Sequence, residues 1–290
     1  MRLACADNTF RLLEPHEHVL ELIRLLDLDA VDLCLMGNRS HVRPEQVRDD
    51  PAGWGERLAQ RVAERGLAIA DVFVIPWTDF ETLAPNHPDP ERRDEAKALF
   101  RDMLTLAVAA GAPGLTLLPG IDWPGESHEA SLVRSAEELE WRALEARSAG
   151  LRLSIEPHFG SVAAHPAEAA RLLELAPTLE LTLDPSHLVY QGFEQGELEP
   201  LVARARHFHA RGAAPGRMQA PLAENTIDFE RLVDSVRDSG YGGFIGLEYV
   251  WLNWEGCNEC DNVAETILLR DRLRARLAGE PWSYPLAATI

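Results

Sequence analysis

The chain has 290 residues, of which 46% are hydrophobic and 26% are charged, proportions typical of a globular protein with a sizeable core. Its 28 lysine and arginine residues face 47 aspartate and glutamate residues, which gives a formal net charge of −19 at pH 7. So acidic a surface repels phosphate backbones and anionic membranes, and it argues against nucleic-acid and membrane partners. A small anionic ligand stays open, because one local arginine can override the global field.

No targeting or membrane segment is expected. The residues after Met1 are too few and too polar for the apolar stretch of a signal peptide. The most apolar region, residues 104–118, is interrupted by Gly111, Pro113 and Gly114, so it is not expected to span a membrane. Four cysteines in a chain of this size, two of them in strand-like segments, indicate reduced thiols and a cytoplasmic protein.

Short apolar runs recur along the chain, several of them preceded by an amphipathic helix that ends in glycine. Glycine suits the left-handed position that ends a helix, and the apolar runs suit strands buried on both faces. The predicted strands are residues 2–6, 30–36, 67–75, 114–119, 151–156, 180–184, 205–209 and 243–248. Eight strands alternating with helices predict a single (β/α)8 TIM barrel of the α/β class. An open doubly wound sheet is the alternative, but residues 6–10 lack the glycine-rich first turn of a dinucleotide-binding fold.

The predicted barrel occupies residues 1–250, and residues 251–290 form a C-terminal loop and helix that packs on it. The helix is expected over residues 263–277. The loop before it contains Trp251 and Trp254, which are expected to pack on the rim of the barrel. A second interpretation gives this loop a part in the wall of an active site.

Four consecutive predicted strands end in side chains that can bind a metal. The fifth ends in Glu156, the sixth in Asp184, the seventh in His209 and the eighth in Glu248. In a parallel barrel these ends project onto one rim. Three carboxylates brought together without a counter-charge repel one another, and a divalent cation resolves that conflict. The oxygen-rich set with one imidazole favours Mg²⁺, Mn²⁺ or Co²⁺ over a thiolate-type zinc site.

The succession of these strand ends, IEPH, LDPSH, HFHARG and GLEYV, resembles the xylose-isomerase-like TIM barrel superfamily, in particular its sugar (phosphate) isomerase and epimerase branch. The resemblance is best over residues 151–248 and extends more weakly over the whole barrel. It implies that Glu156, Asp184, His209 and Glu248 are the metal ligands. Mn²⁺ is the leading candidate cation, with Mg²⁺, Co²⁺ and Zn²⁺ as alternatives.

The same resemblance implies residues that contact a substrate. The histidine three positions after the aspartate ligand is His187. His158, two residues after Glu156, is expected from its position to orient the substrate or the loop rather than to bind metal. The arginine downstream of the histidine ligand corresponds best to Arg217, with Arg211 as a competitor, because the intervening segment AAPG is longer than in ketose epimerases. Trp77 and Trp123 follow the third and fourth strands and are expected either to line the sugar site or to pack on the rim.

The implied reaction is isomerisation or epimerisation of a sugar or keto-sugar by proton abstraction next to a carbonyl, through a metal-stabilised enediolate. Glu156 and Glu248 are the expected acid and base. A lyase or dehydratase of the same fold, acting by inosose-type dehydration or 3-oxo-glycoside cleavage, shares the first steps and stays open. An AP-endonuclease-like phosphodiesterase is disfavoured, because the fourth strand lacks a histidine before Pro119-Gly120 and no Asp-x-His motif follows His209.

Two features stay open at this level. Cys257 and Cys260 form a C-x-x-C spacing, but there is one such pair and no accompanying pair of histidines, so a structural zinc or redox role is not preferred. The expected partner is a small sugar or keto-sugar, and the C-terminal loop and helix leave room for a homodimer or a hetero-complex.

Overall fold

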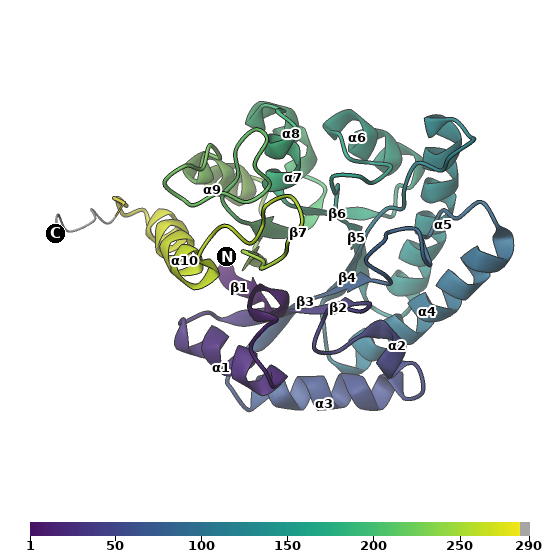
Figure 1. Ribbon diagram of the computed structural model, residues 1–290, viewed down its shortest axis with the longest axis horizontal. Coiled ribbons are helices and arrows are strands. Elements are labelled where there is room, and N and C mark those ends of the chain that lie inside the picture. Colours follow the sequence, from purple (N-terminus) through teal and green to yellow (C-terminus); the bar gives the residue numbers. More distant parts are fainter. Residues whose placement is uncertain (285–290) are drawn as a thin grey trace.

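The computed structural model describes residues 1–284 and shows a closed barrel of eight parallel strands surrounded by helices (Figure 1). Each strand pairs with the next one in the chain, and the barrel closes by pairing of the first strand with the last. The strands are β1 (Arg2–Ala6), β2 (Ala30–Met36), β3 (Ala68–Ile75), β4 (Gly114–Leu117), β5 (Arg152–Ile155), β6 (Glu180–Leu183), β7 (Ala205–Ala210) and β8 (Phe244–Leu247). The prediction of a single (β/α)8 barrel is confirmed.

Helices fill the connections between the strands and cover the outside of the barrel (Figure 1). They are η1 (Asp7–Phe10), α1 (His16–Leu25), α2 (Pro44–Val47), α3 (Pro51–Ala63), α4 (Pro90–Ala109), α5 (His128–Ser148), α6 (Pro166–Leu175), α7 (Pro185–Tyr190), α8 (Gln195–Val202), α9 (Phe229–Asp238) and α10 (Asn262–Ala278). Within the described residues, every helix is too short or too polar to cross a lipid bilayer.

Local sequence explains where the helices begin. Six of them start after an aspartate or serine whose side chain accepts a hydrogen bond from a backbone N–H of the first turn, which satisfies an otherwise unpaired donor. These capping residues are Asp50, Asp89, Ser127, Asp184, Asp228 and Asp261. The helix α10 ends at Gly279, whose φ of +73° is the left-handed conformation that glycine adopts without strain.

Aliphatic side chains fill the space between the barrel and its helices in one large buried cluster. The helix α10 belongs to the same packing, because its Leu269 and Leu273 are buried in that cluster. Residues 248–261 connect β8 to this helix, and in Figure 1 the connection passes over the barrel mouth.

The inside of the barrel is polar at one level, which we call the inner polar layer. It consists of five buried side chains from five consecutive strands: Asp71, Thr116, Ser154, Thr182 and Arg206. The guanidinium of Arg206 donates to the Asp71 carboxylate at 2.8 Å and to the Ser154 hydroxyl at 2.7 Å. The Thr182 hydroxyl lies 2.7 Å from that of Ser154 and 2.6 Å from that of Thr116, which in turn donates to Asp71. Each charge in this layer therefore has an opposite charge and hydroxyl partners.

Candidate metal centre and active site

Beyond the inner polar layer, the ends of β5, β6, β7 and β8 bring together Glu156, Asp184, His209 and Glu248, which we call the strand-end cluster. All four side chains are buried, the most exposed being Glu248 at 4%. The His209 Nδ1 atom lies 2.8 Å from a Glu156 carboxylate oxygen and 3.6 Å from a Glu248 oxygen. The residues expected from the sequence to bind a metal therefore converge at the carboxyl end of the barrel.

Asp184 holds its place in the cluster because it also begins a helix. Its Oδ1 atom accepts a hydrogen bond from the backbone N–H of Ser186 at 2.9 Å, at the start of α7, and Pro185 fixes the first turn. This leaves the Oδ2 atom buried and without a hydrogen-bond partner. The Arg211 Nη2 atom lies 3.0 Å from Oδ2, an ion-pair contact whose alignment does not make a hydrogen bond.

Arg211 and His187 lie side by side next to this carboxylate. The Arg211 guanidinium donates to the Ser186 hydroxyl at 2.8 Å, and its Nη2 atom is 2.9 Å from the His187 Nε2 atom. The other ring nitrogen of His187 lies 3.2 Å from the backbone N–H of Phe159. Burial, with the nearby charges of His158 and Arg211, lowers the pKa of His187 well below its ordinary value. A neutral imidazole carries one N–H, so only one of these two donors is accepted at a time.

Charges in the strand-end cluster are unevenly balanced. Burial, reinforced by repulsion from Glu156 and Asp184, raises the pKa of Glu248 to about 7 against the opposing pull of His209 and Arg211. Burial also acts to raise the pKa of Glu156, but the hydrogen bond and charge of His209 outweigh it and lower that pKa. Burial acts to lower the pKa of His209. The nearby carboxylates, of which Glu248 has the largest effect, outweigh burial and raise that pKa to about 10. Positive charge on His209 thus offsets part of the carboxylate charge.

These residues fit a divalent cation. One ligand atom each from Glu156, His209 and Glu248 lies within 4.8 Å of the others, and Asp184 adds an oxygen that has no hydrogen-bond partner. Three buried carboxylates outnumber the two positive groups, Arg211 and a protonated His209, and a bound cation would replace the His209 proton, because only the neutral imidazole coordinates a metal. A hard cation that prefers oxygen ligands and tolerates one imidazole removes this excess, and Mg²⁺, Mn²⁺ and Co²⁺ are such cations.

A pocket of about 80 Å³ opens onto the cluster. Its lining includes Glu156, Glu248, His158, His187 and Trp254. The indole of Trp254 stacks on the His158 ring, with 5.4 Å between centroids and 25° between planes. Trp254 comes from the loop after β8, so this loop walls the pocket, as the second interpretation of its tryptophans expected.

Of the two arginines expected to contact a substrate, the structure brings only Arg211 into the pocket. The side chain of Arg217 is 37% exposed and pairs with Glu224. Its backbone exchanges two hydrogen bonds with Ala214, at 3.1 and 2.8 Å, across a turn at Gly216, where φ is +73°. This tight turn takes the extra residues of the segment out of the pocket. The structure therefore places Arg211 at the pocket and Arg217 outside it, although the sequence favoured Arg217.

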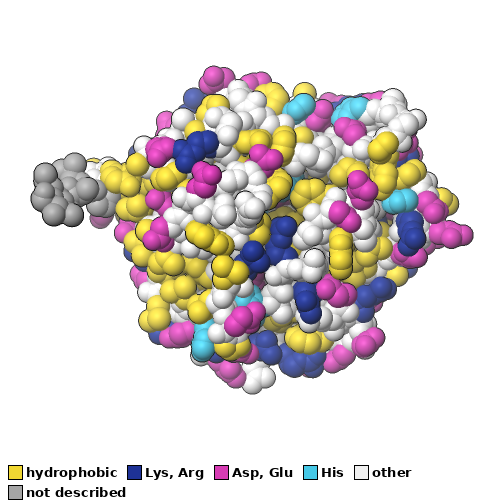
Figure 2. All heavy atoms as spheres, in the orientation of Figure 1, with side chains coloured by type: hydrophobic (Ala, Val, Ile, Leu, Met, Phe, Trp, Pro, Cys, Tyr) yellow, Lys and Arg dark blue, Asp and Glu magenta, His cyan; other side chains and the backbone are white. Residues whose placement is uncertain are grey.

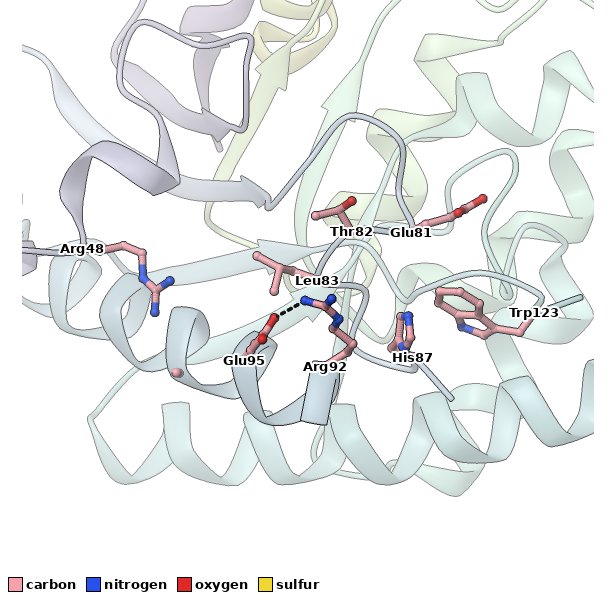
Figure 3. A pocket seen from close by; sticks show the side chains of 9 residues that line it. Arg48, Glu81, Thr82, Leu83, His87, Arg92, Glu95 and Trp123 are labelled. Atoms are coloured by element: carbon pink, nitrogen blue, oxygen red, sulfur yellow. Dashed lines mark hydrogen bonds and ion pairs between the residues drawn. The ribbon is translucent and has the colours of Figure 1, made fainter. Parts of the chain in front are cut away.

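The tryptophans after the third and fourth strands also lie away from the pocket. Trp77 is 36% exposed and is not among the residues that line it. Trp123 borders a separate cavity of about 550 Å³ beside the first turns of α4, next to His87, with ring centroids 4.3 Å apart. In Figure 3 this cavity is flanked by the Arg92–Glu95 ion pair, at 2.9 Å, rather than by converging carboxylates. It offers no ligand set of the kind found at the strand ends.

Cys257 and Cys260 are buried free thiols, 0% and 3% exposed. Burial raises the pKa of both thiols, that of Cys260 to about 11, so neither is a ready thiolate ligand or nucleophile. Gln219 fixes their loop, because its side-chain amide donates to the carbonyls of Val250 at 2.9 Å and Cys257 at 2.7 Å. The C-x-x-C segment is therefore placed as a packing element of the loop that walls the pocket.

Sequence reasoning missed a buried group beneath His209. An Asp32 oxygen from β2 lies 3.1 Å from the His207 Nε2 atom and 3.8 Å from the His209 Nε2 atom. Burial acts to raise the pKa of Asp32, but the charges of the two histidines lower it. The available signal was an aspartate in the middle of the apolar strand AVDLCLM, where an ionised side chain needs a partner from another strand.

A family model described as a xylose isomerase-like TIM barrel matches residues 20–271. No curated protein matches the chain in sequence.

Three solved structures show the fold similarity. D-psicose 3-epimerase in the presence of D-fructose has 14% identity, covers 96% of this chain and 98% of its own, and has a TM-score of 0.72. The probable 3-DHS dehydratase AsbF from Bacillus anthracis has 15% identity, coverages of 94% and 100%, and a TM-score of 0.69. The IolI protein with a binding zinc atom has 14% identity, coverages of 98% and 100%, and a TM-score of 0.72. At these identities the likeness shows a shared fold.

Proposed function

The chain belongs to the xylose isomerase-like TIM barrel family, and from this premise we propose that it is a divalent-metal-dependent isomerase or epimerase of a sugar or keto-sugar. The observation that carries the proposal is the strand-end cluster, in which three buried carboxylates and one imidazole meet at the carboxyl end of the barrel. Such a set can supply the two things that metal-dependent deprotonation next to a carbonyl needs, a cation site and a base beside it.

In this proposal Glu156, Asp184, His209 and Glu248 hold the cation, with Mn²⁺ as the leading candidate. The bound cation supplies Lewis-acid polarisation of the substrate carbonyl. Glu156 and Glu248 flank the substrate; one removes the proton from the carbon next to the carbonyl, and the other returns a proton to it. Return on the opposite face gives an epimer, and return to the neighbouring carbon gives an isomer.

The other pocket residues position the substrate. Arg211 is held by Ser186 at 2.8 Å and by the ion pair with Asp184 at 3.0 Å, so its remaining N–H groups present a fixed donor to a substrate oxygen. His187 lies beside it and offers a second contact. Trp254, stacked on His158, keeps water from the reacting carbons. The segment after β8 thus completes the active site of the barrel on which it packs.

A lyase or dehydratase is the second candidate. It begins with the same proton abstraction and differs in the next step, the loss of a group from the neighbouring carbon. The similarity in fold to the probable 3-DHS dehydratase favours keeping this candidate.

Proton exchange in D₂O, followed by NMR with Mn²⁺ and a panel of ketoses and 3-oxo sugars, tests the proposal. Deuterium next to the carbonyl together with a new stereoisomer or positional isomer supports isomerisation or epimerisation. Deuterium together with a released leaving group supports the lyase. Exchange that persists unchanged in both Glu156→Gln and Glu248→Gln would refute the assignment of the acid and base.

A further inference from the structure

Almost all basic side chains of this protein have an ion pair, a hydrogen bond or an aromatic ring as a local partner. Of its 28 lysines and arginines, only Arg39 and Arg147 have a side chain with no ion pair, hydrogen bond or aromatic ring contact within residues 1–284. Arg147 is exposed near the end of α5, where water solvates it. Arg39 is partly buried just after β2, so its lack of a partner needs a separate explanation.

Arg39 lines the same pocket as Glu156 and Glu248. It is more exposed than these carboxylates, so it lies nearer to the mouth of the pocket. Burial, together with the charge of Arg11, lowers the pKa of Arg39 below its ordinary value. The guanidinium nitrogens of Arg39 still reach solvent, and a partly buried guanidinium without a carboxylate partner favours exchange of that water for an anionic group.

A second guanidinium, that of Arg11, adds to the positive charge near Arg39. Arg11 donates to the backbone carbonyl of Trp251 at 3.0 Å and has no carboxylate within 4.0 Å among the described residues. Figure 2 shows basic side chains near the hollow at the centre of the visible face, while acidic side chains are scattered around it. In a protein with a net charge of −19, basic side chains beside this hollow favour the approach of a small anion to it.

Arg211, the other arginine of the pocket, is not free to bind an anionic group of a ligand. Its guanidinium is paired with Asp184 at 3.0 Å and lies 3.8 Å from Glu248, so its charge is already engaged at the strand-end cluster. The pocket also contains Asn8, which is 1% exposed and whose Oδ1 atom has no hydrogen-bond partner. A guanidinium donor at the pocket is complementary to the anionic end of a ligand.

We propose that Arg39 binds an anionic group, a carboxylate or a phosphate, at the end of the substrate remote from the carbons that react. This inference rests on the proposed function and narrows its substrate class to anionic sugars. The planar guanidinium matches the paired oxygens of either group with two parallel hydrogen bonds, and such charge-assisted contacts are the strong ones. A neutral sugar leaves this guanidinium as unpaired as it is in the structure.

Calorimetric titration of the Mn²⁺-loaded protein with three ligands that differ only at carbon six tests the inference: D-fructose, D-fructuronate and D-fructose 6-phosphate. The wild type is expected to bind at least one of the two anions about tenfold to a hundredfold more tightly than D-fructose, the range expected for a hydrogen-bonded charge. Arg39→Met should reduce this preference to about threefold or less. Arg39→Lys should leave an intermediate preference, because lysine keeps the positive charge but lacks the paired N–H donors of the guanidinium.

Arg147→Met is the matched control, because it removes the other unpartnered guanidinium at the opposite end of the barrel; it should retain the wild-type preference. The better of the two anions identifies the group as carboxylate or phosphate. Equal binding of the three ligands, no binding of either anion, or a preference that survives in a folded Arg39→Met protein overturns the inference. Anion preference without deuterium exchange refutes the proposed reaction alone, and exchange without anion preference refutes this inference alone.

Discussion

Two groups of buried charges lie inside the same barrel and are satisfied to very different degrees. In the inner polar layer one carboxylate, Asp71, meets one guanidinium, Arg206, at 2.8 Å, and hydroxyls complete their hydrogen bonds. In the strand-end cluster three carboxylates share Arg211 and His209, and an oxygen of Asp184 has no hydrogen-bond partner. Both groups are buried, so exposure does not explain the difference.

From this difference we infer a structural role for the inner polar layer and a reactive role for the strand-end cluster. A buried network whose members are all satisfied fixes one arrangement of its strands and offers nothing to a ligand. A buried cluster with excess negative charge and an unpaired oxygen is held together by the surrounding barrel and gains a partner when a cation or substrate binds. The comparison predicts that substitutions in the inner layer change stability, whereas substitutions at the strand ends change binding and turnover.

The largest effect is expected for Glu248→Gln. Loss of one of the two acid–base groups and one ligand should lower kcat by about 10²- to 10⁴-fold in the proton-exchange assay. The midpoint of thermal unfolding of the metal-free protein should stay the same or rise, because the substitution removes repulsion from Glu156 and Asp184. Near-normal turnover in this variant would contradict the assignment of the strand-end cluster.

Arg206→Met tests the other group of charges. It leaves the Asp71 carboxylate buried without its partner, and breaking a buried ion pair in this way costs about 3–5 kcal/mol in the free energy of unfolding. Denaturant titration measures the loss, and the double variant Asp71→Leu/Arg206→Met should recover part of it. An Arg206→Met protein with unchanged stability but impaired turnover would reverse the roles given to the two groups.

Mn²⁺ should stabilise the protein through the strand-end cluster alone. At a concentration 100 times its Kd, a ligand that binds only the folded state adds about 2.7 kcal/mol. Differential scanning fluorimetry should therefore show an unfolding midpoint several degrees higher with Mn²⁺ than with a chelator. The shift should disappear in Glu248→Gln and persist in Arg206→Met; a shift of equal size in both variants would show that Mn²⁺ binds elsewhere.

The smallest effect is expected for the ion pair between Glu230 and Arg272 at the surface. The hydrogen bond from Arg272, at 2.6 Å, is the main cause of the lowered pKa of Glu230. A depressed carboxyl pKa contributes stability above the unfolded pKa, and this contribution is lost as the pH falls through the folded pKa. Because both side chains are partly exposed, Glu230→Gln should cost about 1 kcal/mol or less at pH 7. Urea titrations at neutral and acidic pH should show the difference vanish in acid; a constant difference would contradict the ion pair as its source.

The barrel and the convergence of its last four strands could be predicted from the sequence because both depend on local patterns. A strand that runs into Glu156 or Asp184 carries its own signal, and parallel pairing alone brings the strand ends to one rim. The choice between Arg211 and Arg217 depended instead on how the turn at Gly216 folds. The pairing of Asp71 with Arg206 joins residues 135 positions apart, and no local sequence pattern predicts it.

The order of the strands also decides when a cation can first be held. The strand-end cluster draws its four members from β5, β6, β7 and β8, each a whole strand–helix unit after the last. A growing chain that has not yet delivered Glu248 lacks one member of the cluster and the strand that closes the barrel onto β1. A cation held by all four members therefore requires the closed barrel, in which Arg211 and the His209 contact to Glu156 at 2.8 Å restrain the carboxylates.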